Sequence, residues 1–139
     1  MSARHVFVDS NRRSPLMILF FDRQACAKPE TGGALVRLLL ERGADVNQQD
    51  ENKNTALMFA ADKCDRQTLR MLLKAVAKVN ARNGMNLTAL EMSIVSGNPG
   101  IEELIEAGAR LGAEKAKAYA EASKKNPREL ALIKKASAQ

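Results

Sequence analysis

Apolar residues along the chain fall in short clusters that polar, turn-forming segments separate. Within each cluster they follow the i, i+3, i+4 spacing that places side chains on one face of a helix. The two clearest clusters are Leu69, Leu72 and Leu73, and Ile101, Leu104 and Ile105. Stretches rich in Asn, Asp and Gly, at 47–54 and 80–86, have the composition of turns. The pattern predicts short helices joined in pairs, with an extended loop between successive pairs.

The clusters recur with a fixed period. Thr-Ala-Leu-Met, which begins at Thr55, returns at Thr88 as Thr-Ala-Leu-Glu, 33 residues later, and Ser-Pro-Leu-Met from Ser14 is a third copy. Each hydroxyl residue stands directly before an apolar run, where it can accept a hydrogen bond from the first helical turn. Pro15 then takes the first helical position, where its missing N–H costs nothing. Each unit is therefore predicted to be a helix, a turn, a second helix and a loop.

Two further phrases carry a resemblance to a known family. Residues 43–47 read Gly-Ala-Asp-Val-Asn, and residues 50–57 read Asp-Glu-Asn-Lys-Asn-Thr-Ala-Leu. With the period of 33, these phrases make residues 9–112 similar to ankyrin-repeat proteins. The resemblance implies an all-α solenoid of helix-turn-helix units with short hairpin loops, and a non-catalytic role in protein–protein interaction.

The whole chain is expected to form one ankyrin-repeat domain. Its expected parts are repeat 1 at 9–49, repeat 2 at 50–82, repeat 3 at 83–112 and a degenerate capping helix pair at 113–139. Repeat 1 has about eight extra residues near 24–33, and Gly32-Gly33 is expected to be a hinge before its second helix. The family's Thr-Pro-Leu-His histidine is absent, because Met17, Met58 and Glu91 occupy its place. Any hydrogen-bond network made by that histidine is therefore missing or replaced.

The C-terminal segment, 113–139, is expected to cover the apolar end of the stack. Residues 113–123 form its first helix, and Asn126, Pro127 and Glu129 form a plausible start for the second. The segment has seven basic and three acidic residues, which supply +4 of the chain's net charge of +6. We expect that charge to lie on a solvated outer face. Binding of an acidic partner or a nucleic acid through this basic tail remains the alternative, although aromatic residues for base stacking are nearly absent.

Composition argues against several other classes of protein. The only histidine is His5, and the two cysteines, Cys26 and Cys64, do not form a Cys-x-x-Cys pair. Asp62 and Asp65 lie in a short polar segment with Lys63 and Arg66, which is typical of a solvated turn. No arrangement of these residues supports an enzyme, so no catalytic residue, cofactor or metal site is expected.

The chain also shows no convincing membrane or export signal. No apolar run approaches the roughly 20 residues that span a bilayer. Arg12-Arg13 precede an apolar run at 16–21, but this run of six residues is shorter than the usual ~7–15 of a signal peptide. A cytoplasmic location is expected, and secretion without a signal peptide stays open.

The resemblance implies a partner-binding surface on the loop tips and on the exposed side of the first helices. The residues at those positions are Phe21, Asp22, Glu51, Asn52, Asn54, Asp62, Lys63, Met85, Leu87, Val95 and Ser96. Met85, Leu87 and Val95 are the most suggestive group, because exposed apolar residues mark interaction sites. Partial burial of Leu87 by the neighbouring hairpin is the competing interpretation. The sequence does not identify the protein partner, and it favours a monomer without settling the oligomeric state.

Overall fold

The computed structural model describes residues 8–21, 29–63, 66–97 and 100–137. Within these ranges the chain forms eight α-helices, arranged as four antiparallel pairs, and no strand. The pairs are α1 (Pro15–Phe21) with α3 (Pro29–Glu41), α4 (Ala56–Lys63) with α5 (Arg66–Lys74), α6 (Ala89–Ser96) with α7 (Ile101–Glu106), and α8 (Ala113–Ala122) with α9 (Pro127–Ser137). The predicted all-α solenoid is confirmed.

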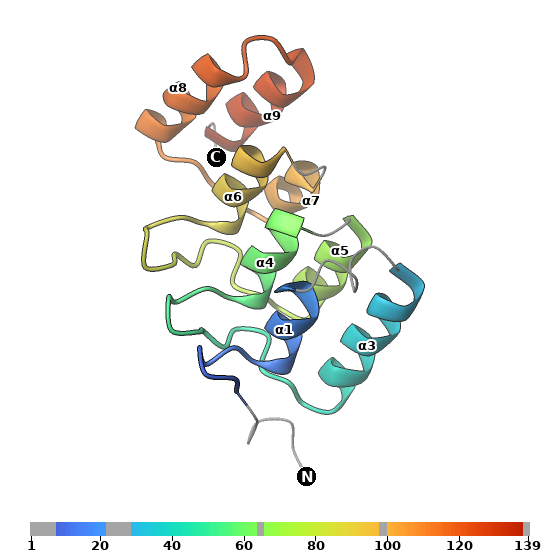
Figure 1. Ribbon diagram of the computed structural model, residues 1–139. Coiled ribbons are helices and arrows are strands. Elements are labelled where there is room, and N and C mark those ends of the chain that lie inside the picture. Colours follow the sequence, from blue (N-terminus) through green and yellow to red (C-terminus); the bar gives the residue numbers. More distant parts are fainter. Residues whose placement is uncertain (1–7, 22–28, 64–65, 98–99, 138–139) are drawn as a thin grey trace.

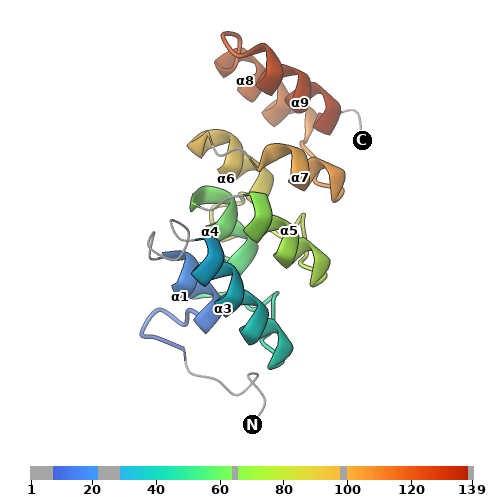
Figure 2. The same ribbon diagram turned by 90° about the vertical axis from the view of Figure 1, so that its right-hand side faces the viewer.

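The helix pairs stack side by side along one axis. The first helices α1, α4, α6 and α8 line one side of the stack, and α3, α5, α7 and α9 line the other (Figure 2). Hairpin loops project from the side of the first helices (Figure 1). Leu57, Leu72, Leu90 and Leu104 are at most 1% exposed, so the core runs through successive repeats. Each repeat therefore covers the apolar face of its neighbour.

The helix starts follow the predicted capping residues. Ser14, Thr55 and Thr88 each accept a hydrogen bond from the backbone N–H three residues later, at 3.4, 3.4 and 3.3 Å. These bonds satisfy donors that the first helical turn leaves unpaired. The three units therefore begin in the same way, as the sequence repeat predicts.

One polar side chain fixes the shape of each hairpin loop. The Asp50 carboxylate accepts the backbone N–H groups of Asn52 and Asn54, at 2.9 and 2.8 Å. Asp9 accepts two N–H groups in the same way in repeat 1, and Asn83 does so in repeat 3. Each tip is therefore held by its own side chain.

Neighbouring hairpins are joined backbone to backbone. The Gly84 N–H donates to the Asn52 carbonyl at 2.8 Å. A Cβ at Gly84 would lie 3.2 Å from that same oxygen, a tight contact, so the close approach favours glycine. The tips of repeats 2 and 3 consequently have a fixed relative position.

At the opposite edge of the stack, asparagines link successive repeats. The Asn47 side-chain oxygen accepts the Lys78 N–H at 2.7 Å, and Asn80 accepts the Arg110 N–H at 3.0 Å. Asn47 and Asn80 stand 33 residues apart, so the same link recurs once per repeat. The stack is thus tied along both edges as well as through its core.

The C-terminal helix pair forms as expected and packs against repeat 3 through α7 and α9. Asn126 accepts the Glu129 N–H at 3.2 Å, and its amide donates back to the Glu129 carboxylate at 3.3 Å. This reciprocal pair is the helix start predicted for α9. Ala116, Ile133 and Ala136 are buried, so the pair contributes to the apolar core.

The expected hinge at Gly32-Gly33 is wrong. Both glycines lie inside α3, which begins at Pro29. Glycine costs a helix about 1 kcal/mol relative to alanine, but tertiary packing offsets that cost here. Gly33 is buried, and a Cβ added to it would lie 3.8 Å from the Met71 sulfur of repeat 2.

Residues 24–28 of the insertion lie outside the described residues, as do His5, Cys26, Cys64 and Asp65.

Candidate protein-binding surface

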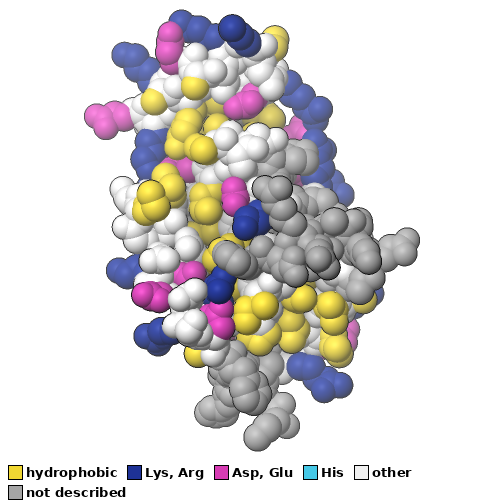
Figure 3. Space-filling model, in the orientation of Figure 1, with side chains coloured by type: hydrophobic (Ala, Val, Ile, Leu, Met, Phe, Trp, Pro, Cys, Tyr) yellow, Lys and Arg dark blue, Asp and Glu magenta, His cyan; other side chains and the backbone are white. Residues whose placement is uncertain are grey.

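Exposed apolar side chains lie on the hairpin and first helix of repeat 3. Met85 is 79% exposed at the hairpin tip, and Val95 is 71% exposed near the end of α6. The space-filling view, in the orientation of Figure 1, shows hydrophobic side chains among polar and charged ones on this face (Figure 3). We refer to Met85, Leu87, Met92 and Val95 as the repeat-3 surface.

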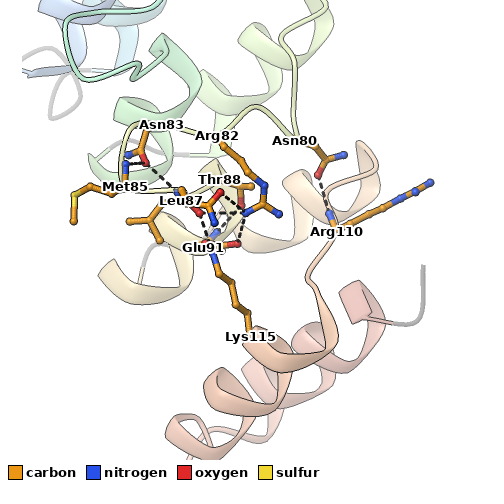
Figure 4. A network of polar contacts seen from close by, with 10 residues as sticks. Asn80, Arg82, Asn83, Met85, Leu87, Thr88, Glu91, Arg110 and Lys115 are labelled. Carbon is orange, nitrogen blue, oxygen red and sulfur yellow. Dashed lines mark hydrogen bonds and ion pairs between the residues drawn. The ribbon is translucent and has the colours of Figure 1, made fainter.

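Met85 is exposed because the loop around it is fixed. The Asn83 side-chain oxygen accepts the N–H groups of Met85 and Leu87, each at 3.0 Å. The Met85 side chain therefore points away from the stack (Figure 4). Leu87 is half-buried, in contrast to the exposed Met85.

The sequence reasoning missed Met92, which belongs to the same surface. Met92 is half-buried and lies three residues before Val95 on α6, a spacing that puts both side chains on one helix face. The Ser96 hydroxyl, one residue further, donates to the Met92 carbonyl at 2.8 Å. The i, i+3 spacing was the signal in the sequence that could have identified it.

A pocket of about 350 Å³ extends the repeat-3 surface toward the C-terminal pair. Ile94 and Val95 line one side of it, and Tyr119, Ser123 and Lys125 line the other. Burial raises the pKa of the Tyr119 hydroxyl, and the negative charge of a nearby glutamate raises it further. Tyr119 is therefore neutral at physiological pH and offers a partner both an aromatic ring and a hydroxyl.

The expected residues on the repeat-2 hairpin divide into two groups. Glu51 and Asn52 are exposed at the tip. Asn54 is half-buried, its amide donates to Asp50 at 3.4 Å, and its oxygen accepts from the Asn83 amide at 2.9 Å. Asn54 thus joins two hairpins, and its side-chain amide and oxygen are both engaged in hydrogen bonds within the protein.

The remaining expected residues lie along the first helices. Asp62 and Lys63 are half-buried at the end of α4, and Ser96 is exposed at the end of α6. Phe21 is the last residue of α1, and Asp22 lies outside the part of the chain that the structure describes. The repeat-3 residues thus form the most apolar part of the expected surface.

Glu91 occupies the place of the missing histidine and is completely buried. The Lys115 ammonium lies 2.7 Å from one of its carboxylate oxygens, and the Arg82 guanidinium lies 3.7 Å from the other (Figure 4). Lys115 also donates to the Asn86 carbonyl at 2.9 Å. An ion-pair network therefore replaces the histidine and ties α8 to repeat 3.

This network corrects the expectation that the whole basic tail is a solvated face. Lys115 faces inward, because the buried Glu91 carboxylate requires a cationic partner. Arg128 lies 3.0 Å from Glu102 on α7, and Lys124 pairs with Glu121. Lys124 and Arg128 stay exposed despite these pairs, as do Lys117, Lys125, Lys134 and Lys135, so Lys115 is the tail cation that departs from the expectation.

Within the described ranges, the His, Cys, Asp and Glu side chains form no group of three that could hold a metal ion. The helices in these same ranges are all too short or too polar to cross a bilayer.

Comparison with known proteins agrees with this geometry. The family model for ankyrin repeats (3 copies) matches residues 23–115, which is more than half of the chain. The chain therefore belongs to the ankyrin-repeat family. It is 35% identical over 71 residues to the mouse (Mus musculus) protein fem-1 homolog A-like, a match that covers 51% of this chain and 11% of that protein. The chain thus corresponds to a small part of that much longer relative.

Proposed function

We propose that this chain binds a protein partner through the hairpin tips of repeats 2 and 3 and the exposed side of α6. Ankyrin repeats are generally protein–protein interaction modules. The observation that carries the proposal is the exposure of Met85 and Val95, at 79% and 71%, on a scaffold held by hydrogen bonds at both edges. Exposed apolar side chains on a polar-rimmed face are typical of docking sites.

The mechanism is docking of a nearly rigid surface. The Asn83 side chain and the Gly84–Asn52 hydrogen bond hold the hairpins before a partner arrives. Little backbone entropy is then lost on association, which improves affinity for a given contact area. A face of this kind suits an interface of about 800 Å² per partner.

The alternative, binding of an acidic partner or nucleic acid by the basic tail, has weaker support. Lys115, Lys124 and Arg128 already pair with carboxylates of this chain. The pairs of Lys124 and Arg128 are exposed and weak, so Lys115, held by the buried Glu91, is the one cation of the seven that these pairs withdraw from contact with phosphates. The ankyrin-repeat family is generally non-catalytic. We therefore propose that this chain has no enzymatic activity. We also propose that it acts in the cytoplasm.

Affinity capture from the native cell extract tests the proposal. The double variant Met85→Asp with Val95→Asp is expected to lose the captured partner, because charge replaces the apolar contact. Leu87 is left unchanged, since Asp at this half-buried position would place a charge partly out of water. Val76→Asp is the matched control, because Val76 is equally exposed outside the repeat-3 surface.

The charge variant Lys125→Glu with Lys134→Glu and Lys135→Glu separates the two candidates. It is expected to capture the partner as the wild type does. Loss of capture in this variant, with retention in the Met85/Val95 variant, would contradict the proposal and support the tail. Denaturation midpoints no lower than that of the wild type establish that loss of folding is not the cause.

A further inference from the structure

The methionine side chains in the described ranges differ sharply in their exposure to solvent. Met17 and Met58 lie in the core at 0 and 1% exposed, whereas Met85 is 79% exposed at the hairpin tip of repeat 3. Met71 and Met92 are half-buried, between these extremes. A reagent that attacks sulfur from solvent therefore reaches Met85 before the other described methionines.

The repeat-3 hairpin keeps its shape without help from the Met85 side chain. The Asn83 side-chain oxygen accepts the backbone N–H groups of Met85 and Leu87, and the Gly84 N–H donates to the Asn52 carbonyl. The Met85 thioether extends away from the stack beyond these bonds (Figure 4). A chemical change at its sulfur thus alters the surface and leaves the fold in place.

The exposed thioether of Met85 reacts with hydroperoxides without any enzyme. A lone pair on sulfur attacks one peroxide oxygen, the O–O bond breaks, and an S–O bond forms. With hydrogen peroxide, the proton on the attacked oxygen passes to the departing oxygen, which leaves as water. Sulfur gives up two electrons to the peroxide, and the product is an uncharged sulfoxide. Methionine sulfoxide reductases reverse the change with electrons from thiols.

The sulfoxide oxygen changes what the repeat-3 surface offers to a partner. Met85 and Val95 are its most exposed apolar side chains, at 79 and 71%. A sulfoxide is a polar acceptor that loses its water when an apolar contact covers it, and burial without a new hydrogen bond is unfavourable. Oxidation of Met85 therefore weakens a contact that depends on apolar burial.

We propose that Met85 is an oxidation site through which hydroperoxides switch off partner binding by the repeat-3 surface. The inference rests on the proposed function, because the switch acts on that surface. The burial of Met17 and Met58 keeps the core reduced at exposures that convert Met85. The oxidised chain is thus folded but deficient in binding.

Treatment of the full chain with hydrogen peroxide tests the first step. Peptide mass spectrometry measures the oxidation rate at each methionine. We expect Met85 to react at least about tenfold faster than Met17 and Met58, because a buried sulfur reacts only after local opening. The denaturation midpoint of the treated chain should equal that of the untreated chain.

The binding step uses as its probe the partner eluted from the untreated chain in the capture experiment. The treated chain is expected to bind this probe at least about tenfold more weakly, because the contact desolvates the sulfoxide. Met85→Leu keeps an apolar side chain without sulfur, so it should bind the probe before and after treatment. Met92→Leu is the matched control, which keeps Met85 and should lose binding on treatment.

Three results would overturn the proposal. Oxidation of Met17 or Met58 as fast as that of Met85 would contradict the difference in access. Undiminished binding by a chain oxidised at Met85 would show that the contact tolerates the sulfoxide. Loss of binding in treated Met85→Leu would place the effect at another residue. Retention of the partner by Met85→Asp with Val95→Asp would instead overturn the proposed function, and the switch with it.

Discussion

Single residues adopt the backbone geometry of the repeat even where their side chains fit it poorly. Gly43 and Gly108 have φ of 83° and 97° after the second helices of their units, and Val76, at the equivalent place in repeat 2, has φ of 65°. A β-branched residue is strained in the left-handed region, because its side chain crowds the backbone there. Position in the repeat therefore outweighs the preference of the individual residue.

Replacing this valine with glycine is expected to stabilise the protein. Val76→Gly should raise the free energy of unfolding by about 1 kcal/mol, because it relieves the strain and Val76 has few contacts to lose. Chemical denaturation measures the change. Gly43→Val is the matched control and should destabilise; equal stability of Val76→Gly and the wild type would contradict the assignment of strain.

The ionisation of Asp9 is expected to make the free energy of unfolding depend on pH. Hydrogen bonds from the Arg13 backbone and side chain lower the pKa of this carboxyl in the folded state. Its stabilising contribution is then present above the unfolded pKa of about 3.9 and is lost as pH falls through the lower folded pKa. Asp9→Asn keeps the hairpin acceptor, as Asn83 does in repeat 3. Denaturation at several pH values should show a smaller acid-induced loss for Asp9→Asn, and an identical loss would contradict the prediction.

At the scale of elements, the sequence predicts what depends on local patterns. The hydroxyl caps and the spacing of Leu69 and Leu72 are readable within a few residues, and the helices form where they indicate. The helical conformation of Gly32 and Gly33 is not predictable locally, because α3 packs against the next repeat at this point. Local sequence carries no direct signal for such a contact.

Like the helical glycines, the Glu91–Lys115 ion pair could not be predicted from the sequence. Its members are 24 residues apart, and Glu91 stands where the resemblance leads one to expect a histidine. Because a buried carboxylate needs a partner, the Glu91 carboxylate holds the Lys115 side chain of α8 against repeat 3. The link joins repeat 3 to the C-terminal pair.

Lys115→Met is expected to lower the free energy of unfolding by about 2 to 3 kcal/mol. The change leaves the Glu91 carboxylate buried with only the more distant Arg82, and the partial exposure of Lys115 reduces the loss. Adding Glu91→Met should recover most of it, because two apolar side chains can replace a buried pair. Urea denaturation of the double-mutant cycle measures the coupling, and additive effects would contradict a direct interaction.

At the scale of the whole molecule, the residues that hold the stack are separate from the exposed apolar side chains of the repeat-3 surface. The core and both edges hold the repeats, and Met85 and Val95 remain exposed on one side. The repeat register predicts which positions lie at the hairpin tips, and Glu51, Asn52 and Met85 are exposed there. It could not predict that Asn54 joins two hairpins or that Met92 continues the surface.

Hydrogen exchange with the captured partner bound tests the binding surface most directly. We expect added protection in the hairpins at 50–55 and 83–88 and along α6, because partner contact excludes water and suppresses local opening there. The segment 113–139 should exchange almost as it does in the free protein. Protection confined to 113–139, with the repeat-2 and repeat-3 hairpins unchanged, would contradict binding through the repeat-3 surface.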